Sequence, residues 1–158
     1  MQTQTINTFL FSELPDEIKK KVLIKYADKG TIDWWYENTF EEAKENGIRL
    51  TGFDLGRGQK IEGTFIWDHL EVANNILKNI TDMHPLFTIS EQFKKQRDEA
   101  IDEYKLDELQ NQYEKDILWQ YWKMLKDEYE HFYSDEYLEE FFDIHEYQFT
   151  ENGVLYNF

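Results

Sequence analysis

Apolar side chains recur three or four residues apart along residues 105–133, a segment that contains no Gly and no Pro. This spacing places side chains on one face of a helix. The stripe consists of Leu106, Leu109, Tyr113, Ile117, Tyr121, Leu125, Tyr129 and Phe132, and Leu118 and Trp122 widen it. Among the remaining positions seven are acidic and four are lysines. The pattern predicts one long amphipathic helix that packs on a core through its apolar face and displays negative charge on the other.

Residues typical of helix starts predict five further helices. These helices begin near Ser12, Asp33, Asp68, Ser90 and Ser134. In the first, Pro15 and the acidic residues after it suit a first turn, and Gly30 is the expected stop. We expect residues 81–88, which contain Pro85, to form a loop.

Strand patterns occur at both ends of the chain and near its middle. Residues 2–11 are rich in Thr, Ile and Phe, and short alternating runs flank GRGQK within residues 48–67. Asn152-Gly153, between two apolar runs, is a strong hairpin signal. We therefore expect a single α+β domain over residues 1–158. One small antiparallel sheet, built from the N-terminal strand, the central hairpin and the C-terminal hairpin, would pack with about five or six helices.

The composition narrows the class of protein. Hydrophobic residues make up 41% of the 158 residues and aromatic residues 17%, which is too much ring surface for a disordered acidic tail. The absence of Cys excludes disulfides and thiolate chemistry and is typical of a reducing compartment. The N-terminal segment has neither the basic start nor the apolar run of a secretory signal, and no apolar run is long enough to span a membrane. We expect a cytoplasmic protein that does not enter a membrane.

The charge is distributed unevenly. Residues 1–97 carry 13 basic and 15 acidic side chains, whereas residues 98–158 carry 4 basic and 18 acidic ones, a net charge of −14 within the total of −16. Such a segment repels nucleic acid and anionic lipid and attracts basic protein surfaces. We therefore expect a basic protein partner and no direct binding of nucleic acid. The alternative is that the acidity only keeps the protein soluble.

The sequence contains no recognisable catalytic motif. The four histidines are far apart in the chain and none has the spacing of metal ligands on a helix. His131 and His145 lie among carboxylates, so a metal site there stays open as an alternative. Neighbouring carboxylates such as Glu139 and Glu140 point apart on a helix, and the serines occupy expected helix starts. We expect a protein that is not an enzyme, with no catalytic residue, no metal and no cofactor.

Several segments match a known family. FSELPDEIKKK, DWWYENTFEEAKENGI, FDLGRG followed by EGTF, HLEVANNIL and YQFTENG occur in this order. Together they resemble a widespread family of short acidic proteins of bacteriophages and prophages, some of them labelled antitoxin-like. The resemblance covers most of the chain and is strongest at residues 9–80 and 134–153. It implies a viral or mobile-element protein in the host cytosol, a setting in which small acidic proteins often inhibit host defence machinery.

The candidate binding residues cluster near the C-terminus. Within residues 128–143, which contain no Lys or Arg, the carboxylates are Glu128, Glu130, Asp135, Glu136, Glu139, Glu140 and Asp143. Those at 136, 139, 140 and 143 share one helix face and loosely imitate the close negative charges of a phosphate backbone. Our leading hypothesis is a phage-encoded inhibitor, of anti-CRISPR or anti-restriction type, that binds a basic nucleic-acid-handling host defence protein, with nucleic-acid mimicry as one mode of binding.

Three consecutive aromatic residues suggest a different interface. Because neighbours on a helix diverge by about 100°, Trp34, Trp35 and Tyr36 cannot all face one core. We expect Trp35 in the core, and Trp34 or Tyr36 as an exposed anchor for a partner. The alternative is that these rings cover a neighbouring strand or loop. An aromatic interface would favour an antitoxin-like or accessory binding module.

Overall fold

The computed structural model describes residues 6–29 and 34–156. It confirms the α+β class, with six α-helices and two antiparallel sheets among these residues. The chain divides into two compact units where the sequence predicts a single domain. Unit 1 comprises Met1–Trp35 and Glu128–Phe158, and unit 2 comprises Tyr36–Asp127. The division has a physical basis, because the apolar stripes of the chain bury themselves in two separate hydrophobic clusters.

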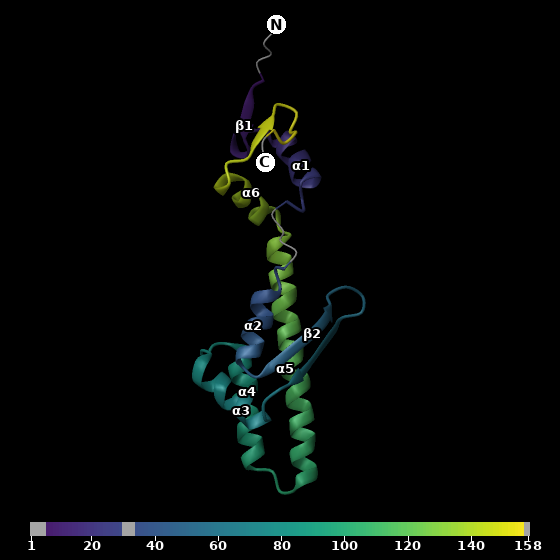
Figure 1. Ribbon diagram of the computed structural model, residues 1–158, viewed down its shortest axis with the longest axis vertical. Helices are drawn as coiled ribbons and strands as arrows, with labels where there is room; N and C mark the ends of the chain where they lie inside the picture. Colours follow the sequence, from purple (N-terminus) through teal and green to yellow (C-terminus); the bar gives the residue numbers. More distant parts are fainter. Residues whose placement is uncertain (1–5, 30–33, 157–158) are drawn as a thin grey trace. The chain divides into compact units, whose positions relative to one another are not determined.

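Unit 1 brings the two ends of the chain together. Strand β1 (Thr8–Leu10) pairs antiparallel with β4 (Gln148–Thr150), and Phe9 lies opposite Phe149. The short 3-10 helix η1 (Phe11–Glu13), α1 (Asp16–Lys25) and α6 (Asp135–Ile144) pack with these strands (Figure 1). The buried side chains of this cluster are Phe11, Leu14, Val22, Leu138, Phe142, Phe149 and Leu155. This unit is therefore held together by segments that are far apart in sequence.

The structure confirms the C-terminal hairpin. The Gly153 N–H donates to the Thr150 carbonyl at 2.9 Å, and the Thr150 N–H donates to the Val154 carbonyl at 2.8 Å. Gly153 has a φ of +84°, a conformation in which a side chain is strained. The Asn-Gly pair therefore reverses the chain and lets Leu155 bridge to Phe149.

Unit 2 is built around α5 (Glu103–Phe132), whose residues up to Asp127 belong to it. The long helix is confirmed. Its other elements are α2 (Glu37–Glu45), β2 (Ile48–Asp54), β3 (Lys60–Phe65), α3 (His69–Asn79) and α4 (Pro85–Asp98). Strands β2 and β3 form the predicted central hairpin. They make a sheet of their own, so the described strands form two two-stranded sheets in place of the one expected.

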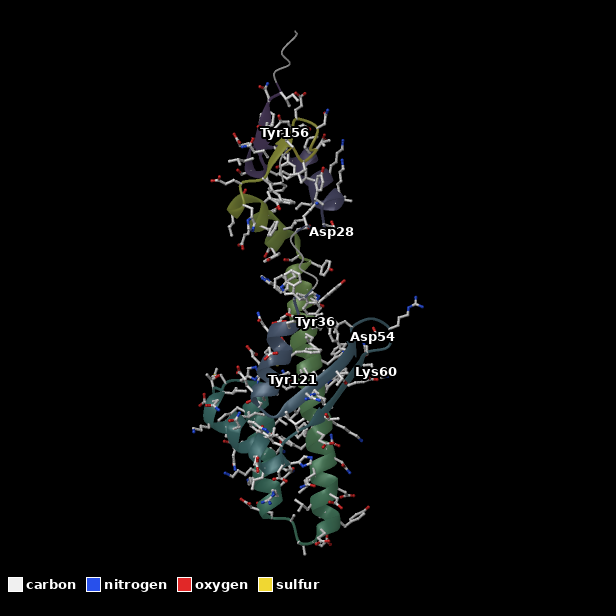
Figure 2. The ribbon with its side chains drawn as sticks, in the orientation of Figure 1. Asp28, Tyr36, Asp54, Lys60, Tyr121 and Tyr156 are labelled. Carbon is white, nitrogen blue, oxygen red and sulfur yellow. The ribbon has the colours of Figure 1, made fainter. Side chains whose placement is uncertain are left out.

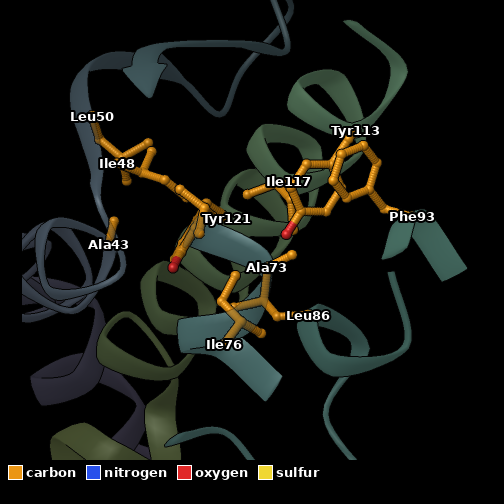
Figure 3. Close-up of a cluster of buried hydrophobic side chains, with 11 residues drawn as sticks. Ala43, Ile48, Leu50, Ala73, Ile76, Leu86, Phe93, Tyr113, Ile117 and Tyr121 are labelled. Atoms are coloured by element: carbon orange, nitrogen blue, oxygen red, sulfur yellow. The ribbon is translucent and has the colours of Figure 1, made fainter. Parts of the chain in front are cut away.

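The core of unit 2 confirms the apolar stripe of α5. Tyr113, Ile117 and Tyr121 are buried against side chains from the hairpin, α3 and α4 (Figure 3). The Phe93 ring of α4 stacks on Tyr113 with a centroid distance of 4.1 Å. Leu86 is also buried in this cluster. The middle of the predicted stripe therefore locates this core, whereas Tyr129 near the end of the helix is 40% exposed, contrary to the expectation for that position.

The predicted helix starts are partly confirmed. Asp68 caps α3 by accepting from the Leu70 N–H, and Ser134 caps α6 by accepting from the Tyr137 N–H, both at 3.2 Å. The first predicted helix is present but starts later than expected: Ser12 lies in the 3-10 helix η1, and α1 begins at Asp16, directly after Pro15. Gly30 and Asp33 lie outside the described residues.

The predicted loop at residues 81–88 is confirmed only for residues 81–84, and the predicted helix start at Ser90 is wrong. Helix α4 begins at Pro85, because the His84 ring accepts from the Leu86 N–H at 3.0 Å and proline suits a first helical position. Ser90 lies inside this helix and is fully buried. Its hydroxyl is 2.6 Å from the Tyr113 hydroxyl, a long-range pairing that the local sequence does not reveal.

Candidate protein-binding surface

Helix α6 has two chemically distinct faces. One face is apolar and buried, since Leu138 is 3% exposed and Phe142 is fully buried. The Phe142 ring lies 5.5 Å from Phe11 and 5.2 Å from Phe149, measured between ring centroids. These contacts fix the rotation of α6 about its axis and therefore determine which residues face solvent.

The opposite face carries four carboxylates, which we call the acidic ridge: Glu136, Glu139, Glu140 and Asp143. All four are exposed except Glu139, which is half-buried. Helical neighbours three or four residues apart are about 5–6 Å from each other, so the four charges form one continuous strip. Within the described part of the chain, no ion pair involves any of them.

The remaining acidic candidates are less closely grouped. Asp135 is exposed at the start of α6, beside the acidic ridge. Glu130 is exposed on the last turns of α5. Glu128 is half-buried on α5 and has an interaction within the chain, so it is not equivalent to the ridge residues. The structure thus brings together five of the seven predicted carboxylates on α6.

Ile144 is an exposed apolar residue next to the acidic ridge. We expect it on the apolar face of α6 from the spacing, yet its side chain is 75% exposed. It follows Glu140 by four residues, so it lies on the same side of the helix as that carboxylate. Ile144 follows the buried Leu138 by six residues and Phe142 by two, spacings that point it away from the buried face of the helix. The expectation for Ile144 is therefore wrong, and the helical spacing itself accounts for its exposure.

The aromatic candidates have different environments. Trp34 is 57% exposed and stays available as an anchor. Trp35 is half-buried, and its ring lies 5.8 Å from Tyr129. Tyr36, labelled in Figure 2, is half-buried between Phe40 and Phe53, with centroid distances of 5.1 and 5.5 Å. Tyr36 therefore serves packing within unit 2, as the alternative interpretation of these rings predicts.

Four of the five basic residues of unit 1 lie on α1, and no ion pair joins them to the acidic ridge in the described part of the chain. Lys19 lies over the Phe11 ring at 5.7 Å and Lys25 over the Tyr26 ring at 5.4 Å. The ion pairs of Lys60 with Glu62, His69 with Glu114 and Lys105 with Glu108 all lie in unit 2. The negative charge of α6 is thus presented to solvent.

The structure gives no support to a metal site at the histidines. His145 lies 4.3 Å from the Phe141 ring, and His131 lies 5.0 Å from the Tyr137 ring, so both pack on aromatic side chains. No group of three potential ligands close enough to hold a metal ion occurs in residues 6–29 and 34–156.

Across the same residues, no helix is both long and apolar enough to span a bilayer.

Two buried tyrosines are the most perturbed acid groups of unit 2. Burial raises the pKa of Tyr121 to about 12; its hydrogen bond from Asn46 opposes this shift, and the charge of Glu42 adds to it. Burial also raises the pKa of Tyr113 far above its ordinary value, against the opposing effect of its hydrogen bond with Ser90. Both side chains are therefore neutral at physiological pH. Figure 2 labels Tyr121, and Figure 3 shows both rings in the core.

Comparison of the chain with protein-family models, with curated proteins and with solved structures found no match.

Proposed function

We propose that this protein is an inhibitor that binds a basic, nucleic-acid-handling protein through the acidic ridge of α6. The observation that carries the proposal is a strip of four carboxylates on one helix face, three of them exposed and Glu139 half-buried, with no ion pair from the described residues to neutralise them. In this proposal the protein acts in the host cytosol, has no catalytic activity and needs no cofactor.

The physical argument is electrostatic complementarity. A DNA strand carries one negative charge per ~3.4 Å, and the acidic ridge presents its charges about 5–6 Å apart. A groove that binds a phosphate backbone with Lys and Arg side chains would accept such a ridge. Complementary charge also accelerates association at low salt.

The choice of partner class follows from the resemblance to phage and prophage proteins. Such proteins act inside a bacterial host, where nucleases and other defence proteins have basic grooves for nucleic acid. An inhibitor of anti-CRISPR or anti-restriction type that mimics nucleic acid fits both the setting and the ridge. The partner is then a host defence protein, and the chain itself binds neither nucleic acid nor membrane.

A second candidate is an antitoxin-like or accessory binding module with an aromatic or apolar interface. The specific observations that favour it are the exposure of Trp34, at 57%, and of Ile144, at 75%. Large exposed apolar side chains often anchor protein interfaces. In this case the carboxylates of α6 would serve only solubility.

Charge reversal tests the proposal. Tagged wild-type protein is used to capture and identify binding proteins from lysate of a bacterial host, together with a variant in which Glu136, Glu139, Glu140 and Asp143 are changed to Lys. A control variant carries the same number of Lys substitutions at exposed carboxylates of unit 2: Asp82, Glu91, Asp98 and Glu99. All three proteins are first compared by circular dichroism and thermal melting.

We expect wild type and the control variant to capture the same nucleic-acid-binding protein, and the ridge variant to lose it. Because the two variants have the same net charge, this difference would report the position of the charges. Capture of one partner by all three proteins would contradict the proposal. Loss of that partner on Trp34→Ala and Ile144→Ser substitution would then favour the module.

A further inference from the structure

Helix α1 presents positive charge to solvent in unit 1. Its inner face is fixed by Val22, which is fully buried, and by Ile18, which is half-buried one turn earlier. The exposed lysines of the helix are Lys20, Lys21 and Lys25, which we call the basic patch. In the described part of the chain, no ion pair involves any of these three lysines. Their charges are therefore available to a partner.

An exposed isoleucine accompanies each of the two charged surfaces of unit 1. Ile24 follows Lys20 by four residues and Lys21 by three, so it lies among the lysines of the basic patch. Its side chain is 81% exposed. Ile144, which is 75% exposed, lies beside Glu140 of the acidic ridge in the same way. Unit 1 thus leaves two large apolar side chains in water, one within positive charge and one next to negative charge.

The basic patch and the acidic ridge are complementary in charge. The patch carries three positive charges and the ridge four negative ones, and both belong to unit 1. No ion pair between them occurs among the described residues of one chain. Helices α1 and α6 pack on the same hydrophobic cluster, so one copy of unit 1 presents both surfaces at once (Figure 1).

We propose that unit 1 binds a second copy of itself, with α1 of each protomer against α6 of the other. A two-fold axis makes the two contacts equivalent and closes the assembly at a dimer. In each contact the lysines of the basic patch lie against the carboxylates of the acidic ridge. Ile24 and Ile144 are removed from water at the same time, which supplies the apolar part of the interface.

The net charge of the chain opposes this association, and screening decides which effect is larger. Each protomer carries a net charge of −16. Charges farther apart than about 8 Å are largely screened at physiological ionic strength, whereas the opposite charges of α1 and α6 are in contact in the dimer. Because only two helix faces of each protomer are covered, we expect a weak dimer with a dissociation constant on the order of 10 μM.

The dimer goes beyond the proposed inhibitor function and does not depend on it. It covers the acidic ridge, so a basic partner would have to displace the second copy in order to bind. Dimerisation is measured with this protein alone and capture is measured with host lysate, so the failure of one proposal is distinguishable from the failure of the other.

An exchange of charge between the two helices tests the dimer by sedimentation velocity of the full chain. One variant carries Lys20→Glu, Lys21→Glu and Lys25→Glu, and the other is the four-Lys ridge variant. We expect wild type to form dimers at about 100 μM, roughly ten times the expected dissociation constant. Each variant alone should be monomeric, because its α1 and α6 have the same sign of charge. Their equimolar mixture should form dimers again, because every α1 then meets an α6 of opposite charge.

A charge control separates this contact from an effect of net charge. The control carries Lys44→Glu, Lys78→Glu and Lys95→Glu, three substitutions at exposed positions of unit 2. It has the same net charge as the α1 variant and should dimerise as wild type does.

A second pair of variants tests the apolar part of the interface without any change of charge. Ile24→Ser with Ile144→Ser should weaken the dimer about tenfold or more. Met83→Ser with Ile101→Ser removes two side chains of unit 2 that are 89% and 95% exposed, and should leave the dimer unchanged.

All variants are first compared by circular dichroism and thermal melting, and recovery of dimers in the mixture would itself show that both charge variants are folded. A monomeric wild type at about 100 μM would overturn the proposal. Dimers of either charge variant alone, a mixture that stays monomeric, or wild-type affinity in the Ile24→Ser, Ile144→Ser protein would overturn it as well.

Discussion

At the scale of single residues, two tyrosines of α5 combine a buried aromatic ring with a hydroxyl that needs a hydrogen-bond partner. Tyr113 and Tyr121 follow the helical spacing of a core face and are buried, as the sequence predicts. Each also brings a hydroxyl into the core, where it must find a partner. The two partners come from different elements, Ser90 on α4 and Asn46 at the end of α2.

Burial of these hydroxyls makes the stability of the protein depend on pH in the alkaline range. The pKa of Tyr121 is about 12 in the folded chain and about 10 when unfolded. Folding therefore favours the neutral form, and the contribution is complete below pH ~10 and is lost as pH rises toward 12. The free energy of unfolding should fall by about 1.4 kcal/mol per pH unit in this window because of Tyr121 alone.

Chemical denaturation at a series of pH values, compared between wild type and Tyr121→Phe, measures this contribution. Lysines and other tyrosines titrate in both proteins, so only the difference between the two curves is informative. The variant should lose stability less steeply above pH ~10. Parallel curves would show that the Tyr121 hydroxyl is not buried in the folded protein.

Burial of single residues could be predicted from the sequence at some positions and not at others. Spacing correctly predicts that Ile117 is buried, because helical periodicity is a local property. The expectations for Ser90 and Ile144 are wrong. Ser90 resembles a helix-start residue but pairs with Tyr113, a contact between distant segments. Ile144 is apolar but lies on the same side of α6 as Glu140, so its residue type suggested burial where its position on the helix does not.

At the scale of elements, the C-terminal hairpin positions β4 against the core of unit 1. The Asn152-Gly153 turn was predictable because its requirement for positive φ is local. A Cβ at Gly153 would also come within 3.0 Å of methyl groups of Ile18 and Val22. The turn is therefore both conformationally special and closely packed against α1.

Gly153→Ala should destabilise the protein by about 1–3 kcal/mol, because the new methyl group adds backbone strain to a steric clash. Gly52→Ala is the matched control. Gly52 lies in β2, and the nearest atom to an added Cβ is a Glu62 side-chain oxygen at 3.6 Å, an ordinary contact. Urea denaturation of the two variants measures the difference. If Gly153→Ala were as stable as Gly52→Ala, the packing of the turn on α1 would be incorrect.

The existence of most elements was predictable, and their pairing was not. Periodicity and turn residues are local signals, so they located the long helix, both hairpins and the caps at Asp68 and Ser134. The N-terminal strand was also expected, although it covers only Thr8–Leu10 of the described residues. Which strands meet in one sheet depends on long-range packing, and here the terminal strands and the central hairpin form separate sheets.

At the scale of the whole chain, the two units differ in the distribution of their charge. Unit 1 carries 5 basic and 14 acidic side chains, a net charge of −9, and unit 2 carries 12 and 19, a net charge of −7. All 5 basic residues of unit 1 precede Trp34, and its residues 128–158 contain no Lys or Arg. The acidic ridge is therefore the most one-sided charged surface that the sequence and the fold together define.

The ridge was predictable from the sequence, but its boundaries were not. Helical spacing is sufficient to group Glu136, Glu139, Glu140 and Asp143. It does not reveal that Glu128 is engaged within the chain, nor that Tyr36 packs inside unit 2. The two compact units reflect long-range packing, because the spacing of an apolar stripe does not indicate which other stripe it packs against.

The central claim is that the acidic ridge occupies a nucleic-acid groove on its partner. The most direct test measures the dissociation constant of the complex with the captured partner between about 50 and 200 mM salt, with and without a competing DNA duplex. The account predicts that affinity falls steeply with salt, that the four-Lys ridge variant does not bind, and that DNA and this protein exclude each other. A dissociation constant independent of salt, together with a ternary complex that contains DNA, would contradict it.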